Sequence, residues 1–149
     1  MPVVKRYAVA PLEHVFEVIS DPTTYPDWLA GAKEIRSVDD DWPKAGSRFH
    51  HTVGLMKIIT VNDSTEVLEV DPPNRLVLEV RVRPFGRGRT EFHLAPAGTH
   101  DGVERTSIVM TEEPIGLTKL FAPVIDPTID ARNRASLNAL VARLNEPGQ

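Results

Sequence analysis

The sequence contains no cysteine among its 149 residues. Disulfide bonds, thiolate nucleophiles, zinc–thiolate centres and iron–sulfur clusters are therefore excluded. Aromatic residues are scarce, at 6% of the chain, and charge of neither sign dominates, since 17 basic and 21 acidic residues leave a formal net charge of -4. Such a chain has no overall field that attracts phosphate backbones, so we expect no nucleic-acid partner.

Long apolar runs are also missing. No stretch approaches the roughly 18 apolar residues of a membrane-spanning helix. Lys5 and Arg6 are followed by only six uncharged residues before Glu13, which is too short for the apolar core of a signal peptide. We therefore expect no integral membrane association and, by default, a cytoplasmic protein. The sequence does not specify an oligomeric state.

What is present is an ordinary globular composition, with 41% hydrophobic and 26% charged residues. A chain of this length forms one domain by default and buries about 70% of the surface of its unfolded form. No internal repeat, low-complexity tract or linker divides the sequence. We expect a single domain over residues 1–149.

Hydrophobic periodicity predicts an α+β protein. Residues 3–9 alternate as a strand does, residues 12–19 place apolar side chains at helical spacing, and a short helical turn is expected within 23–31. Beyond them, runs rich in Val, Ile, Thr and Leu alternate with turn residues at roughly ten-residue spacing, which is typical of antiparallel strands. We place six further strands at 32–39, 47–53, 58–70, 75–83, 89–96 and 103–113.

The strand at 75–83 has one apolar and one charged face, so its sheet must be covered on one side. The only long element left for this is C-terminal, where apolar stripes occur at 117–124 and 137–144. Pro123 and Pro127 interrupt the path between the stripes. They predict a short first segment, a break, and then a helix over about 128–145.

Two features of this C-terminal third allow alternatives. Asp126 precedes Pro127, so we expect it to cap the resumed helix; alternatively Asp126, Asp130 and Asn133 hydrogen-bond a ligand. The last strand carries apolar residues in both phases. Either Ile108 and Met110 or the residues that alternate with them therefore face the interior.

Several strings resemble one superfamily, that of the START, Bet v 1 and polyketide-cyclase proteins. Residues 10–21, APLEHVFEVISD, with YPDW at 25–28, resemble its opening. Residues 69–76, EVDPPNRL, resemble its strand turn, and the leucine spacing over 137–144 resembles its closing helix. The order of expected elements agrees with that of the superfamily along nearly the whole chain. A stretched turn at 98–103 departs from its pattern.

The resemblance implies a helix-grip fold, in which a seven-stranded antiparallel sheet curls around a long C-terminal helix, with two short helices between the first two strands. Sheet and helix would then enclose a cavity for a small hydrophobic molecule. The alternative is that the same side chains simply fill the core. By strand and helix phase we expect the cavity wall to contain Phe49, His51, Val53, Leu78, Val80, Val82, Phe92, Ile129, Asn133 and Leu137.

The resemblance also implies an entrance near two hairpin tips and the start of the last helix. Apolar side chains at loop tips are costly unless they are covered or used, which favours a gate at this position. The alternative is that Leu55 and Phe85 pack into the core. The expected gate residues are Leu55, Met56, Phe85, Ile115 and Phe121.

Histidine is the first candidate for catalysis, because its pKa lies near neutral pH. His50 and His51 are adjacent on a predicted strand, so only one of them points inward, and the alternation with Phe49 and Val53 selects His51. It would serve as a general base or acid; the alternative is a histidine that is satisfied by a backbone group. We expect no metal and no cofactor, since the sequence has no HExxH motif and no spaced His and carboxylate pair.

The densest basic region comprises Arg81, Arg83, Arg87 and Arg89. It either pairs with neighbouring glutamates across the solvent-facing side of two strands or holds an acidic group at the mouth of the cavity.

Three functions are compatible with these observations. The first is binding of a small hydrophobic ligand, such as a lipid, an isoprenoid quinone or a polyketide-like molecule, in the internal cavity. The second is a polyketide cyclase or dehydratase that uses the same cavity, although no strong catalytic constellation marks the chain as an enzyme. The third is a protein-interaction or chaperone-like module, which requires a filled interior and an exposed apolar patch.

Overall fold

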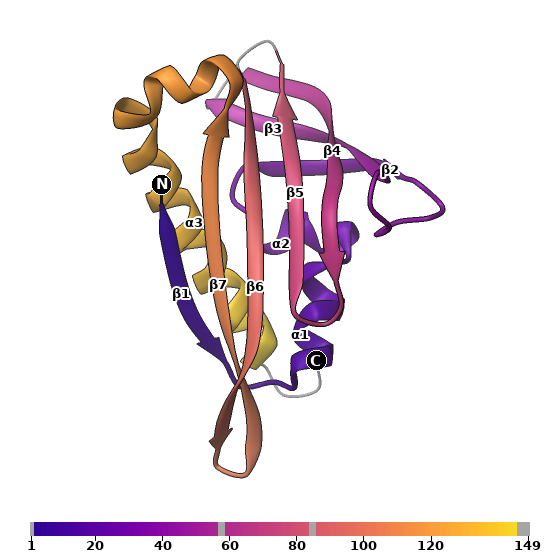
Figure 1. The fold of residues 1–149 in the computed structure, drawn as a ribbon, viewed down its shortest axis with the longest axis vertical. Coiled ribbons are helices and arrows are strands. Elements are labelled where there is room, and N and C mark those ends of the chain that lie inside the picture. The colour runs from indigo at the N-terminus through magenta and orange to yellow at the C-terminus, as the bar shows by residue number, and fades with distance from the viewer. Residues whose placement is uncertain (1, 57–58, 84–85, 146–149) are drawn as a thin grey trace.

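The architecture comes from a computed structural model, which describes residues 2–56, 59–83 and 86–145 (Figure 1). The chain forms seven strands and five helical segments within this part. In chain order they are β1 (Val3–Ala8), α1 (Leu12–Ile19), η1 (Pro22–Thr24), α2 (Tyr25–Trp28), β2 (Ala32–Val38), β3 (Arg48–Met56), β4 (Ile59–Asp71), β5 (Arg75–Val82), β6 (Gly86–His100), β7 (Val103–Ile115), η2 (Gly116–Phe121) and α3 (Ala122–Asn145).

The seven strands form one antiparallel sheet in the order β1-β7-β6-β5-β4-β3-β2. Figure 1 shows β2 and β3 running across the direction of β6 and β7, so the sheet curls strongly, and α3 lies behind β1 and β7. The short helices α1 and α2 lie between β1 and β2 in the chain. The expected helix-grip fold is confirmed.

The core lies between the concave face of the sheet and the helices. Leu76 and Leu78 of β5 belong to the core cluster, as the alternation along this strand predicts, but Val77 and Glu79 on the opposite face are buried as well and not exposed as expected. In β7 the buried pair is Ile108 and Met110, which settles the phase of the last strand. The C-terminal half of α3 contributes buried leucines at helical spacing, at positions 137, 140 and 144.

Five of the nine aromatic residues form one cluster. Tyr25 of α2 makes edge contacts with Trp28 and Phe49, and its ring centroid lies 5.4 Å from each of theirs. Trp42 and Phe92 extend this cluster through Phe49 and Trp28 respectively. Edge-to-face pairs of this kind are each worth about 1 kcal/mol beyond their buried area. The aromatic cluster therefore fixes α2 against the start of β3.

The predicted break in the last helix is wrong. Helix α3 is continuous from Ala122 to Asn145, with Pro127 inside it. Pro127 lies in the second turn, where its missing N–H removes one backbone hydrogen bond, to the carbonyl of Pro123, and its ring is exposed. Asp126 consequently lies within the helix and does not cap it.

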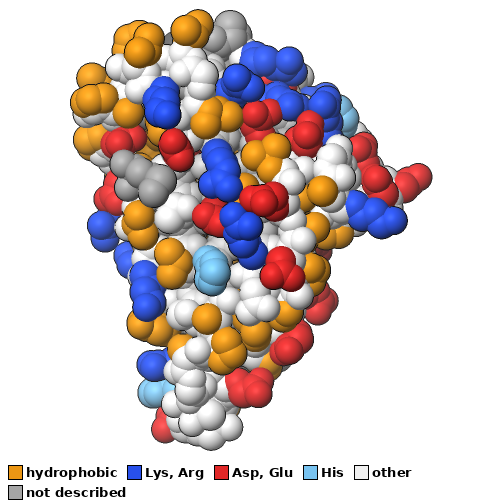
Figure 2. All heavy atoms as spheres, in the orientation of Figure 1, with side chains coloured by type: hydrophobic (Ala, Val, Ile, Leu, Met, Phe, Trp, Pro, Cys, Tyr) orange, Lys and Arg blue, Asp and Glu red, His pale blue; other side chains and the backbone are white. Residues whose placement is uncertain are grey.

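The basic region on the outer face of the sheet is paired with carboxylates. Arg81 lies 2.5 Å from Glu79 and 3.2 Å from Glu66. Arg87 and Arg89 also reach glutamates, as the interpretation of a solvent-facing ladder predicts. Figure 2 shows acidic and basic side chains interleaved over this face. The arrangement favours pairing within the sheet over an anion site at the cavity mouth.

The carboxylate of Asp63 on β4 accepts four hydrogen bonds, one from Ser64 and three from Arg83. Its Oδ1 accepts hydrogen bonds from Ser64 N and Arg83 Nη2, both at 2.8 Å, and its Oδ2 accepts from Arg83 N at 2.8 Å and Nε at 3.1 Å. Burial alone would raise the pKa of this carboxyl, but the bonds from Arg83 and Ser64 outweigh burial and lower the pKa to about 2.

The change Asp63→Asn is expected to lower the free energy of unfolding by about 1–2 kcal/mol at pH 7. The folded-state pKa lies below the ordinary value, so this stabilisation is present above about pH 4 and is lost as the pH falls toward about 2. Urea unfolding at several pH values measures the difference, with Asp40→Asn on an exposed turn as control. A difference that stays constant down to the lowest pH would contradict this account.

The loop after α2 is fastened to α3. Ala30 N donates to Ser136 Oγ at 2.8 Å, and Arg132 Nη2 donates to Ala30 O at 3.0 Å. Gly31 has a φ of +87° in this loop, and a Cβ built at Gly31 would lie 1.7 Å from Arg132 Nη2. The backbone angle therefore favours glycine at position 31, and any larger residue would also displace the guanidinium group of Arg132.

Gly31→Ala is expected to destabilise the fold by about 2 kcal/mol, from the positive φ and from displacement of Arg132. In an Arg132→Ala background the clash is gone, so the same substitution is expected to cost about 1 kcal/mol, from the backbone alone. Chemical unfolding of the unchanged protein, of the two single variants and of the double variant measures both costs in free energy. Equal costs in the two backgrounds would show that the guanidinium contact at Gly31 has no energetic weight.

Candidate functional site

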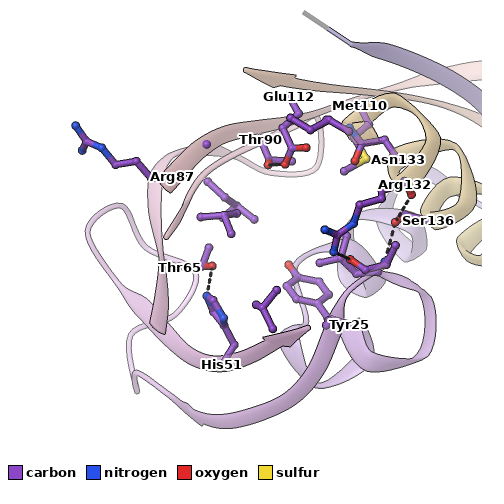
Figure 3. Close-up of a pocket in the computed structure, with 18 of the residues that line it drawn as sticks. Tyr25, His51, Thr65, Arg87, Thr90, Met110, Glu112, Arg132, Asn133 and Ser136 are labelled. Atoms are coloured by element: carbon purple, nitrogen blue, oxygen red, sulfur yellow. Dashed lines mark hydrogen bonds between the residues drawn. The ribbon is translucent and has the colours of Figure 1, made fainter. Parts of the chain in front are cut away.

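A cavity of about 290 Å³ lies between the concave face of the sheet, the loop after α2 and the first half of α3. Figure 3 shows its wall, to which strands of the sheet and α3 contribute side chains from opposite sides. Apolar side chains make up most of the wall, and a few polar groups interrupt it. Sites of this composition are where proteins bind small molecules.

Most residues expected on the wall are found there. The structure places Phe49, His51, Val53, Leu78, Val80, Phe92, Ile129 and Asn133 on the lining. The side chain of Val82 lies outside the described residues. Leu137 is a correction, because it is fully buried in the core and does not line the cavity. It lies one helical turn beyond Asn133, where α3 already packs tightly.

The gate that the sequence analysis expects stays a prediction. Phe85 and the side chains of Leu55 and Met56 lie outside the described residues. Ile115 alternates with Pro114, and only Pro114 lines the cavity. Phe121 is 59% exposed on η2 and does not line the cavity either. Neither side chain therefore belongs to the lining, and a role of Ile115 and Phe121 at the entrance stays a prediction.

An exposed apolar patch does exist on η2 and the first turn of α3. Figure 2 shows hydrophobic side chains gathered over this corner of the molecule. The patch comprises Leu117, Leu120, Phe121 and Val124, which are exposed by 81%, 76%, 59% and 78%. The exposed patch agrees with the protein-interaction hypothesis. That hypothesis also requires a filled interior, whereas the interior contains a cavity.

His51 is the titratable group that the sequence selected, and it lies in the cavity wall. It is buried, and its Nε2 lies 2.9 Å from Thr65 Oγ1 on the neighbouring strand. Burial is the main reason why its pKa lies below the ordinary value, and the nearby Arg36 and His50 add to the effect. The imidazole is therefore neutral at pH 7 and is able to accept a proton.

A second titratable group, Glu112, was missed by the sequence analysis. It lies on β7 two residues beyond Met110, and it is paired across the strands with Thr90, whose Oγ1 donates to its Oε1 at 2.9 Å. Arg132 and Asn133 of α3 lie on the adjoining wall. Glu112 has the same phase along the strand as Ile108 and Met110. The sequence would therefore have predicted an inward-facing Glu112 if the phase of the last strand had been known.

The two titratable groups are shifted in opposite directions. Burial raises the pKa of the Glu112 carboxyl, while the bond from Thr90, the amide of Asn133 and the charge of Arg132 offset part of this effect. Figure 3 shows Glu112 and Thr90 across the cavity from His51 and Thr65. Each wall therefore offers one group that favours its neutral form.

Tyr25 also lines the cavity, but its hydroxyl is already used. It donates to the carbonyl oxygen of Ile19 at 2.5 Å, and the side chain is almost completely buried. Burial and the nearby Asp21 hold the pKa of Tyr25 far above its ordinary value. The residue is thus a structural part of the wall.

Within the described ranges, no group of three or more His, Asp and Glu side chains has the arrangement that holds a metal ion. Within the same ranges, no helix combines the length and apolar character needed to cross a bilayer.

Solved structures similar to this one share the fold along nearly its whole length. An aromatase/cyclase from a Streptomyces species is 18% identical with a TM-score of 0.71, covering 95% of this chain and 91% of that one. A protein of Deinococcus radiodurans is 16% identical with a TM-score of 0.68, covering 97% and 96%. The di-domain ARO/CYC protein BexL is 11% identical with a TM-score of 0.67, and the match covers 97% of this chain but 49% of BexL.

No curated protein sequence matches the chain significantly. The sequence model of one family does match, over residues 3–145, and it describes polyketide cyclases, dehydrases and lipid transport proteins. This match spans every strand and helix of the fold. The chain belongs to the polyketide cyclase/dehydrase and lipid transport family.

Proposed function

We propose that the chain binds a small hydrophobic molecule in the cavity between the sheet and α3. The observation that carries this proposal is the largely apolar lining of an internal space of about 290 Å³. Ligand sites commonly measure roughly 300–1,000 Å³, so this space lies at the lower end of the range. A compact molecule of one to three rings or a short chain fits it better than a long-chain lipid or a quinone with a long isoprenoid tail.

The family supports the same function. Its description combines polyketide cyclases and dehydrases with lipid transport, and each of these activities requires an apolar molecule to be held out of water. The absence of a filled interior counts against a module that acts only through its surface. We therefore place the ligand inside the cavity, in contact with Leu78, Val80 and Phe92.

Leu78→Arg tests the cavity face directly. Leu78 is buried on the wall, so an arginine there would fill part of the space and introduce a charge into it. We expect at least a tenfold weaker affinity for the neutral fluorescent probe N-phenyl-naphthylamine, measured by titration, with circular dichroism to verify the fold. His93→Arg on the exposed side of β6 is the matched control and should bind normally. Unchanged binding in folded Leu78→Arg would place the ligand elsewhere.

A second candidate function is a cyclase or dehydratase that acts on the bound molecule. The specific observation in its favour is a neutral, buried imidazole in the wall, oriented by Thr65. Such a group removes a proton from the carbon beside a carbonyl, which is the step shared by aldol cyclisation and dehydration. In this reading His51 is the general base and the cavity holds the substrate against it.

His51→Ala is expected to lower kcat by about a hundredfold for a compact β-hydroxyketone, such as the aldol adduct of benzaldehyde and acetone. Dehydration of this substrate produces a conjugated ketone that is followed by its absorbance. The rate should rise with pH through the lowered pKa of His51 and stay level at neutral pH, because the base must be unprotonated. His50→Ala is the control. Turnover that survives in His51→Ala would remove this assignment.

A further inference from the structure

The polar corner of the cavity is formed by three elements. Glu112 enters it from β7, Thr90 from β6, and Asn133 from α3 (Figure 3). The hydroxyl of Thr90 donates to Oε1 of Glu112, which leaves Oε2 as the place where a proton on the carboxyl would sit. Asn133 is buried, and among the described residues its Nδ2 has no hydrogen-bond partner. This corner therefore has hydrogen-bonding capacity left for a ligand, as does the opposite wall, where the Nδ1 of His51 has no partner in the described part of the chain.

The charged and titratable groups around this corner are few. From α3, Arg132 approaches, but its Nη2 is engaged with the carbonyl of Ala30. From β3 and α2, His51 and Tyr25 face the same space, and both favour their neutral forms. From β6, Arg87 contributes to the lining, but its guanidinium end extends away from the other side chains in Figure 3, and its Nη1 lies 3.2 Å from Glu79 Oε1. With burial dominant, the pKa of Glu112 lies above its ordinary value.

We propose that Glu112 determines which ligands the cavity accepts, by donating a hydrogen bond from its protonated carboxyl to a neutral carbonyl oxygen of the ligand. This inference rests on the proposed function, because it concerns the same cavity. It names the ligand class more closely: a compact apolar molecule that carries a ketone, aldehyde or quinone oxygen at the end that reaches β7. A hydrocarbon of the same shape leaves the carboxyl without a partner.

The proposal also predicts that ligand choice depends on pH. A protonated carboxyl donates to a carbonyl oxygen, whereas an ionised carboxylate is only an acceptor and repels it. The preference for carbonyl ligands should therefore be largest at low pH and should fall as the pH rises through the raised pKa of Glu112. A hydrocarbon ligand should show no such change, because it has no group that meets the carboxyl.

The experiment compares acetylnaphthalene with ethylnaphthalene, which have nearly the same shape and differ in the carbonyl oxygen. Dissociation constants are measured by fluorescence titration from acidic to alkaline pH. For the unchanged protein we expect acetylnaphthalene to bind about tenfold more tightly than ethylnaphthalene at low pH, the effect of one hydrogen bond in a dry site. The ratio of the two constants should approach one at alkaline pH.

Three variants separate the role of the proton from that of shape. Glu112→Gln keeps an N–H donor but does not titrate, so the carbonyl preference should persist at every pH. Glu112→Leu removes the donor, so both probes should bind equally. Glu113→Gln, on the opposite side of β7 and near Lys119, is the control and should behave like the unchanged protein. If Glu112→Leu does not fold, the pH profiles of the unchanged protein and of Glu112→Gln still decide the question.

The outcomes distinguish this inference from the function on which it rests. Equal binding of the two probes by the unchanged protein at all pH values would overturn the inference and leave the proposed function intact. A carbonyl preference that survives in Glu112→Leu would overturn it as well, because another group would then be the donor. Failure of both probes to bind would count against the cavity as a ligand site and so overturn both.

Discussion

The packing of α3 against the curled sheet is the constraint on which the rest of the structure depends. A helix of 24 residues is about 36 Å long, and here its two halves have different neighbours. Leu137, Leu140 and Leu144 fasten the C-terminal half in the core. In the first half, Ile129 and Asn133 instead face open space. The helix is thus held at one end, and the sheet curls away from it at the other end to leave a cavity.

The cavity gains its chemical character from what burial does to a few polar groups. Burial shifts the pKa of His51 downward and that of Glu112 upward, so both side chains favour their neutral forms in the same apolar space. The outer face of the sheet differs from the cavity because it contains charged side chains. There Arg81 forms ion pairs with Glu66 and Glu79. The curl of the sheet therefore separates a charged exterior from an interior suited to uncharged molecules.

Much of the fold was predictable because its signals are local. The alternation of β5 identified Leu78 and Val80 as inward residues, and the alternation of β3 selected His51 over His50. Turn residues between the strands indicate the antiparallel order from the sequence alone. The residues that the sequence assigned to the wall come from strands or helix turns with one apolar face.

The features that escaped prediction depend on non-local packing. The rule that proline ends a helix failed at Pro127, because α3 is anchored further along and tolerates one missing hydrogen bond near its start. Glu112 was missed because β7 has apolar residues in both phases, and only contact with α3 decides between them. The bonds that fasten Ala30 to Arg132 join residues about a hundred positions apart, and no sequence pattern signals them.

We propose that the space between the sheet and α3 holds a small hydrophobic molecule. Native mass spectrometry of the protein purified from its own host tests it most directly, with denaturation afterwards to release and weigh whatever is bound. The account predicts one compact, uncharged molecule per chain, and the Leu78→Arg variant purified in the same way should lack it. Purification of both proteins without any bound molecule, together with failure of added hydrophobic probes to bind, would contradict the account.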